Sequence, residues 1–266
     1  MNGIEWIVPV VLTVITASTP LVFAAIGELV TEKSGVLNLG VEGMMLVGAV
    51  SAFAVASSTG SGSLGIIAGA AAGALMAAIF GWLTLTLLAN QVATGLALTI
   101  FGVGFSALIG SAFVGFAIEP LPKLNLPGLS EIPIVGPLLF GQDFLVYLSF
   151  ASVFAVGWFL KNSHGGMVLR AVGESHDSAH AIGYNVIGIR YLATMFGGAM
   201  SGLGGAYLSL VYTPMWAENM TSGRGWIALA LVVFATWRPG RLILGAYMFG
   251  GITILQLNAQ GLGLDV

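Results

Sequence analysis

Residues Gly27–Gly43, GELVTEKSGVLNLGVEG, place three glutamates, a lysine and an asparagine within seventeen positions of a chain that is otherwise mostly apolar. In lipid such side chains are costly, so they belong where helices break or where water enters. Glu28 and Glu32 are four residues apart and so share a helix face, as do Asn38 and Glu42.

The pair Ser34-Gly35 lies between these two helical faces and is a natural break. We therefore expect one helix to end near Val30, an irregular hinge to run through Gly35, and the next helix to begin near Asn38. Irregular backbone at membrane depth is tolerated only where it is buried in protein or lines a water-filled cavity. The alternative is an interfacial turn with solvated glutamates, in which Asn38 caps the second helix.

The composition around this stretch is that of an integral membrane protein. Of the 266 residues, 57% are hydrophobic and 7% are charged, and the mean hydropathy is +0.98; an average soluble domain has roughly 25% charged residues. Apolar runs of about 20 residues recur, the length of a spanning helix rather than of a barrel strand. The chain contains no cysteine, and its net charge of −3 gives no basic surface for nucleic acid.

The fold class predicted is an all-α polytopic helix bundle that forms a single domain over residues 1–266. Hydropathy gives eight candidate spans: 7–28, 39–57, 64–88, 92–117, 143–160, 191–212, 224–237 and 242–258. The span 224–237 is short for the hydrocarbon thickness, so it either starts earlier, near Met215, or is re-entrant and turns back. Glycines four apart, Gly69 with Gly73 and Gly198 with Gly202, predict closely packed helices.

Lysines and arginines set the predicted orientation. With the amino terminus outside, Lys123 and Arg224 remain outside, and the cytoplasmic side receives Lys33, Lys161, Arg170, Arg190, Arg238 and Arg241. The proline-rich loop 118–142 then faces outward and the hydrophilic loop 161–190 faces the cytoplasm.

No internal energy source or catalytic constellation is evident. The chain has no phosphate-binding loop and no His-Glu-x-x-His motif, and no span carries the relay of acids and bases expected of an ion-driven pump. His176 and His180 have metal-like spacing but no third ligand, so we expect neither a catalytic nor a metal site, and no cofactor. Any uphill transport would draw its energy from another chain.

The cytoplasmic loop contains LRAVGESHDSAHAIGYNV, residues 169–186, which has the length of an amphipathic helix and a terminating glycine at Gly183. Such a helix could dock as one rigid piece into a partner's groove, although a solvated connector would have the same pattern.

Three stretches resemble the permease subunits of bacterial ABC importers of the nucleoside type, relatives of the ribose and branched-chain amino-acid permeases: residues 19–49 (TPLVFAAIGELVTEKSGVLNLGVEGMMLVGA), residues 169–186 and residues 197–210 (GGAMSGLGGAYLSL). The resemblance implies that the loop motif is the coupling helix that contacts the cytoplasmic ATPase. It places this contact on Arg170, Gly173, Glu174, Ala179, Ile182 and Gly183. The stretch SHDSAH departs from the family, in which a proline and paired alanines are common.

The resemblance implies a multi-pass subunit of the bacterial cell membrane that pairs with a second, homologous permease, two ATPase chains and an extracytoplasmic binding protein. Its cargo would be nucleosides, with sugars or branched-chain amino acids as alternatives. Family members continue with a further apolar span beyond the equivalent of Val266, so we expect the sequence to be incomplete at its C-terminus.

Polar residues near helix breaks are the candidates for the translocation pathway: Asn38, Glu42, Gln91, Thr94 and Asn219. Tyr212 and Trp216 could stack on a flat base or sugar or serve only as interfacial anchors. An ion-driven secondary transporter and a membrane enzyme using the loop histidines are the rival classes, and neither explains the loop motif.

Overall fold

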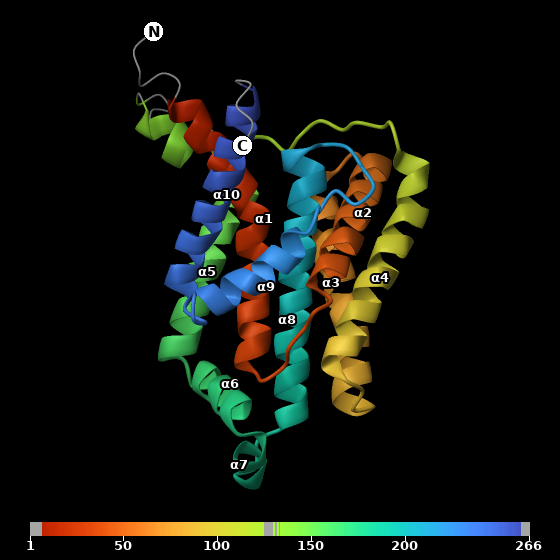
Figure 1. Cartoon of the computed structure of the whole chain (residues 1–266), viewed down its shortest axis with the longest axis vertical. Helices are drawn as coiled ribbons and strands as arrows, with labels where there is room; N and C mark the ends of the chain where they lie inside the picture. The colour runs from red at the N-terminus through yellow and green to blue at the C-terminus, as the bar shows by residue number, and fades with distance from the viewer. Residues whose placement is uncertain (1–6, 125–129, 131, 133, 262–266) are drawn as a thin grey trace.

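The computed structural model describes residues 7–124, 130, 132 and 134–261, and these form a bundle of helices (Figure 1). No strand is longer than an isolated bridge within these ranges. The helices are α1 Ile7–Lys33, α2 Val41–Thr59, α3 Gly62–Gly81, α4 Gln91–Gly110, α5 Phe144–Asn162, α6 His164–Glu174, α7 His176–Ala181, α8 Val186–Tyr207, α9 Arg224–Phe234 and α10 Pro239–Gly261. Short π-helical turns extend α3 through Trp82–Thr86 and α8 through Leu208–Tyr212.

Seven of the described helices are long and apolar enough to cross a membrane, which confirms the all-α polytopic class. The eighth predicted span is α9, whose 11 residues cover about 16 Å.

The bundle has two distinct ends (Figure 1). The α6 end carries α6, α7 and the C-terminal ends of α1 and α5, and the far end carries the α2–α3 turn and the segment 114–124. Six of the eight basic residues gather at the α6 end, as the charge count predicted: Lys33, Lys161, Arg170, Arg190, Arg238 and Arg241. Arg224 departs from that prediction, because it lies half-buried inside the bundle at the start of α9.

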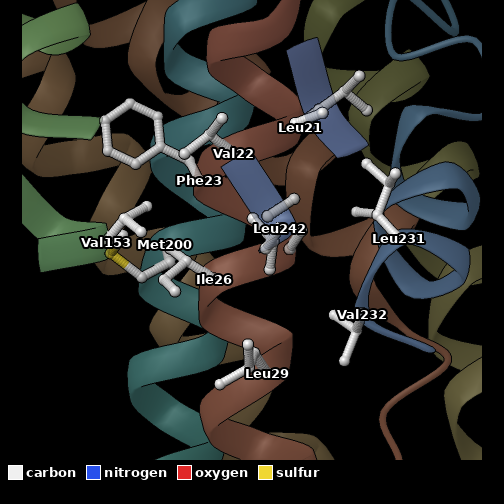
Figure 2. Packing of buried hydrophobic residues seen from close by; sticks show 14 of the residues in the cluster. Leu21, Val22, Phe23, Ile26, Leu29, Val153, Met200, Leu231, Val232 and Leu242 are labelled. Carbon is white, nitrogen blue, oxygen red and sulfur yellow. The ribbon is translucent and has the colours of Figure 1, made fainter. Parts of the chain in front are cut away.

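The largest core cluster surrounds α1, which is packed by α5, α8, α9 and α10 (Figure 2). Phe23, Ile26 and Leu29 of α1 are fully buried there, against Met200 of α8 and Val232 of α9. Residues 17–31 of α1 are buried on all sides. A helical segment in this position needs apolar residues around most of its circumference, and this explains why it has no amphipathic stripe.

A second region, α2 with α3 and α8, is held by backbone contacts at glycines. A side chain added at Gly48 would meet the backbone of Gly202, and one added at Gly73 would meet the carbonyl of Gly198. A side chain at Gly205 would meet the Met45 carbonyl. The predicted glycine spacings therefore mark closely packed helices, as expected in lipid.

The structure corrects the predicted boundaries in the stretch 27–43. Helix α1 continues to Lys33, past the predicted end at Val30, and α2 begins at Val41, after Asn38. Gly35 does mark the break, with φ +80°. Asn38 therefore lies in the connection 34–40 and shares no helix face with Glu42, and Gly40 stands at the N-cap of α2.

The structure contradicts both alternatives that were predicted for residues 224–237. The helix does not begin near Met215, since it starts at Arg224, and the segment does not turn back. Its preceding segment, 213–223, starts at the far end, where Ile118 N donates to the Pro214 carbonyl (3.0 Å). The segment following α9 ends at the α6 end, where Trp237 donates to Glu32. An irregular segment and a half-length helix thus complete one crossing together.

Candidate functional site

The candidate site is the junction at Glu42, where two irregular segments meet near mid-depth. A side chain added at Gly43 would lie 2.6 Å from the Leu98 carbonyl, so the start of α2 is level with the middle of α4. The connection 34–40 reaches this level from the α6 end, and the segment 213–223 reaches it from the far end. Transporter folds often place their sites at such interruptions near the bilayer midplane.

The Glu42 carboxylate holds the N-terminus of α9. Its Oε1 accepts hydrogen bonds from Thr221 Oγ1 (2.5 Å) and Gly223 N (2.8 Å), and its Oε2 accepts one from Gly225 N (2.5 Å). The first amides of a helix lack internal partners and carry the positive end of the helix dipole, so a carboxylate is well suited to them. Glu42 is 4% exposed, so these contacts are largely shielded from solvent.

The Glu32 carboxylate holds the opposite end of α9. The Trp237 indole N–H donates to Glu32 Oε2, and the Lys33 ammonium lies 5.9 Å from the centre of the Trp237 ring. Thr236 and Trp237 have φ values of +51° and +52°, in the left-handed region that residues other than glycine rarely adopt. The tight turn between α9 and α10 is thus attached to the C-terminal turn of α1.

Glu28, the third carboxylate, holds the connection between α1 and α2. Its Oε1 accepts the Asn38 N–H (3.0 Å), and the Asn38 side chain accepts from Gly40 N (2.9 Å) and lies 3.4 Å from the Met44 sulfur. The charged stretch 27–43 therefore contains one glutamate for its own connection and one for each end of α9. The pairing of these carboxylates with Thr221, Gly223, Gly225 and Trp237 was not predicted. The Ser222-Gly223 pair just before a short apolar run was the available signal for the start of a helix.

The predicted pathway residues fall into two groups. Asn38 and Glu42 are buried, and so is Thr94 on α4, while Gln91 accepts the Leu37 N–H (2.9 Å) and so joins the start of α4 to the connection 34–40. Asn219 is exposed, in the segment before α9, with φ +55°.

The two aromatic candidates also differ. Trp216 is 3% exposed and packs against Gly110 and Phe53, which leaves no free ring face for a cargo molecule. Tyr212 is half-buried, and the guanidinium of Arg224 lies 5.3 Å from its ring centre.

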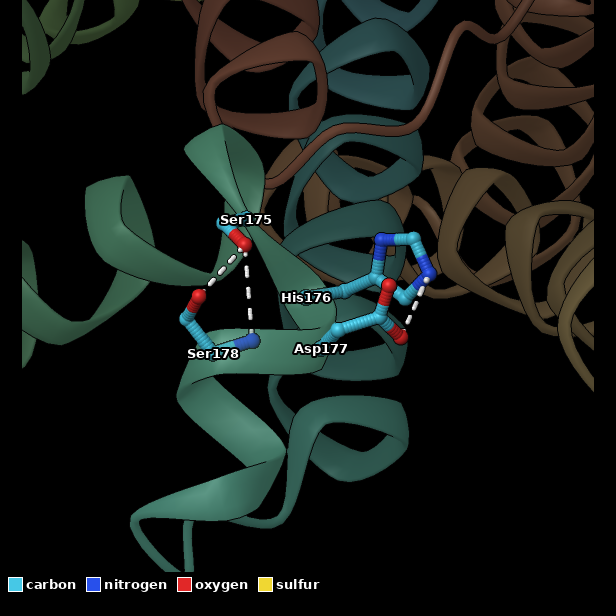
Figure 3. A network of polar contacts seen from close by, with 4 residues as sticks. All are labelled: Ser175, His176, Asp177 and Ser178. Atoms are coloured by element: carbon cyan, nitrogen blue, oxygen red, sulfur yellow. Dashed lines mark hydrogen bonds and ion pairs between the residues drawn. The ribbon is translucent and has the colours of Figure 1, made fainter.

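The predicted coupling helix is two helices. It breaks at Ser175, whose hydroxyl accepts the Ser178 N–H (3.4 Å) and caps α7 (Figure 3). His176 and Asp177 form an exposed pair, 3.4 Å apart. Gly183, with φ +92°, ends α7 as predicted. A Ser-x-x-Ser pattern is a capping signal that could have located the break.

The six predicted coupling residues lie on one projection. Ala179 is buried with Val172 and Val186, so α6, α7 and the start of α8 share a small core. Four of the six are exposed and available to a partner: Arg170, Glu174, Ile182 and Gly183.

Gly173 anchors this projection to the end of α1. A side chain there would meet the Lys33 carbonyl and would lie 3.1 Å from Gly35 N. Arg190 Nε donates to the Ser34 carbonyl (3.0 Å) on the same turn. A pocket of about 390 Å³ lies beside this contact, lined by Glu32, Lys33, Arg170, Gly173, Glu174 and Trp237.

A known protein family matches almost the whole chain. Residues 10–262 match the family described as the branched-chain amino acid transport system / permease component. The chain belongs to this permease family. No solved structure matches it.

Several curated relatives of the permease are ABC transporter subunits. It is 44% identical to the putative glucose ABC transporter permease protein TsgC13 of Haloferax volcanii, over 94% of this chain and 77% of the relative. It is 31% identical to the guanosine permease protein NupQ of Bacillus subtilis, over 88% and 77%. It is 30% identical to the nucleoside permease protein NupC of Lactococcus lactis, over 97% and 84%. As an ABC transporter permease subunit, the chain is a multi-pass membrane protein and not itself an enzyme.

Proposed function

We propose that this permease forms half of the translocation pathway of an ATP-driven importer in the bacterial cell membrane. Its partners would be a cytoplasmic ATPase, a second permease and an extracytoplasmic binding protein. The observation that carries the proposal is a projecting α6–α7 unit, fixed through Gly173 to the α1 end that also holds α9. A force on the projection would therefore be transmitted through contacting residues to α9, in the middle of the bundle.

In this proposal the ATPase contacts the exposed side chains of the projection, with the α6 end in the cytoplasm. Arg170 and Glu174 lie at the rim of the pocket beside Trp237, and Ile182 is 72% exposed. ATP binding would close the ATPase pair and carry α6 and α7 with it. Movement of Gly173 would shift the α1 end, then Trp237 through Glu32, and finally α9.

The proposed pathway passes the junction at Glu42. Asn219 would face the cargo, while Asn38, Glu42, Gln91 and Thr94 would shape the route by fixing the backbone around it. The hydrogen bonds of Glu42 with Thr221, Gly223 and Gly225 support this role, since they fix the position of α9.

Nucleosides are the proposed cargo, because two relatives are named as guanosine and nucleoside permeases. Glucose is the second candidate, because the relative at 44% identity is named as a putative glucose permease. Both molecules carry a hydroxylated ring.

The test is uptake of labelled guanosine and of labelled glucose by cells with the complete transporter, with intact ATPase and with a variant unable to hydrolyse ATP. ATPase-dependent uptake of guanosine supports the nucleoside assignment, and uptake of glucose alone replaces it. Absence of both, with the ATPase still co-purifying, discards both cargoes and keeps the permease. Uptake that survives loss of ATP hydrolysis but collapses with the ion gradient contradicts the ATP-driven mechanism.

A further inference from the structure

Between α8 and α10 the chain crosses the bundle partly as irregular backbone and partly as helix α9. The irregular part, residues 213–223, lies on the far-end side of α9 and contains no regular helix. The chain leaves α8 at Tyr212 and descends through residues 213–223 to the Glu42 junction. Asn219, Ser222 and Gly223 have φ values of +55°, +49° and +83°, so the lower part of this segment is tightly turned.

The segment has buried residues that attach it to the bundle and, in its part next to the Glu42 junction, an exposed polar stretch. Trp216 and Thr221 are buried and attach it to the bundle, through Gly110 of α4 and Glu42 of α2. Close to the Glu42 junction three side chains with polar groups are exposed, Glu218, Asn219 and Ser222, which we call the polar strip. Nearer to α8 the exposed side chains include Thr213 and Met215, the latter at 49%.

The polar strip is unlike the exposed surface of the neighbouring spans. Helix α4 exposes Ile100 and Leu108, each at 74%, and α10 exposes Leu244 at 71%. Such side chains suit contact with lipid tails. A carboxylate, an amide and an irregular backbone do not, because lipid offers no hydrogen-bonding partner.

The strip must therefore be covered by protein or by water. Within the described residues, Glu218 has no basic side chain within salt-bridge distance; the one pair found there joins His176 and Asp177. A dry contact with a subunit surface that offers no cation would leave this carboxylate buried and unpaired, at a cost of several kcal/mol. Water satisfies the strip at a much lower cost.

We propose that the polar strip is one wall of a water-filled translocation route whose facing wall is supplied by the second permease subunit. The inference rests on the proposed function, and it places the translocation route beside the segment that leads into α9. The strip offers hydrogen-bond donors and acceptors and a carboxylate, so it suits an uncharged hydroxylated solute better than an anionic one.

The natural absence of cysteine makes the test direct. Single variants Asn219→Cys and Ser222→Cys are made in the complete transporter, with Leu244→Cys as the lipid-facing control and Ser58→Cys, at the exposed end of α2, as the aqueous control. Each is labelled with a charged, membrane-impermeant thiol reagent.

We expect the two strip cysteines to react at least about tenfold faster than Leu244→Cys, because hydrocarbon excludes a charged reagent. Their labelling should block uptake, and saturating cargo should slow it, whereas labelling of Ser58→Cys should leave uptake unchanged.

Strip cysteines as unreactive as Leu244→Cys, in a transporter that still imports cargo, overturn the inference and leave the proposed function standing. Fast labelling that leaves uptake intact also overturns it, since the strip would then be only a surface loop. Reaction rates that change with the nucleotide state of the ATPase, in a transporter that imports neither guanosine nor glucose, support the water-filled wall and discard the proposed cargo.

Discussion

Two regions of this permease are held together in opposite ways. In the α2–α3–α8 region, glycines bring helix backbones into contact along several turns, so no single contact defines the packing. Helix α9 packs on α1 with its apolar side, but its position along the bundle depends on a glutamate at each end. The α2–α3–α8 region therefore cannot shift without a collision between helix backbones, whereas α9 can shift when its attachments to the glutamates break.

The largest expected effect is in the glycine-packed region. Gly205→Val would drive two methyl groups into the backbone of Met45, where even a Cβ has no room. Overpacking commonly costs 1–3 kcal/mol and more where backbone must move, against a total stability on the order of 5–15 kcal/mol. We expect the variant to disappear from the membrane fraction on an immunoblot.

Gly104→Ala is the matched control, because a Cβ at Gly104 on α4 meets no atom within 4 Å. It should accumulate at the normal level. Normal amounts of Gly205→Val in the membrane would contradict the conclusion that backbone contacts at glycines fix the α2–α3–α8 region.

The next effect is at the N-terminal attachment of α9. Glu42→Ala would leave the Thr221 hydroxyl and the amides of Gly223 and Gly225 without their acceptor. A buried polar group left unpaired costs about 1–3 kcal/mol. We expect the protein to remain in the membrane, with a lower Tm in detergent and uptake reduced by about tenfold or more, since α9 is displaced.

Glu42→Gln sharpens this prediction, because its amide retains one acceptor oxygen and should recover part of the Tm but not all of it. Asp177→Ala is the control, since the Asp177 side chain is 91% exposed, and its Tm should be unchanged. An unaltered Tm in Glu42→Ala would contradict the role of Glu42 as an attachment.

A smaller effect is expected at the other attachment. Trp237→Phe retains a ring near Lys33 and loses the N–H that donates to Glu32. One such bond contributes about 1 kcal/mol, so the protein should fold normally. If the bond passes movement from the projection to α9, ATP hydrolysis continues while uptake falls several-fold. An equal fall in ATP hydrolysis and uptake would argue against transmission through Trp237.

The smallest effect is expected at the start of α4. Gln91→Ala removes the acceptor of the Leu37 N–H at a position open to solvent, so water can replace it. A loss of about 0.5 kcal/mol or less is expected, with a correspondingly small change in Tm and in uptake. A large loss of uptake at unchanged Tm would give Gln91 a direct role in the pathway.

The sequence predicts the long spans well, because a run of about 20 apolar residues has few alternatives in a membrane. It locates the stretch 27–43 as exceptional but misses where its helices end. Helix α1 continues through Glu32, whose carboxylate is bonded to Trp237, 205 positions further along the chain. Local patterns contain no information about such a pair. The attachment of α9 to Glu42 was unpredictable for the same reason.

Local chemistry explains the other differences. Ser175 breaks the predicted coupling helix because its hydroxyl can cap the helix that follows. Trp216 is buried rather than free to stack because Gly110 leaves room for its ring. The roles assigned to the coupling and pathway residues remain predictions, and the variants above test several of them.

The contact between Gly173 and the turn Lys33–Gly35 has a mechanical consequence. A push on the projection acts on the end of α1, which holds Trp237 through Glu32, whereas Glu42 belongs to α2, whose position the glycine contacts fix. A rod pivots when one of its two supports moves and the other stays in place. Helix α9 would therefore tilt about its N-terminus at Glu42, and a small displacement at Trp237 would be enough to change its angle.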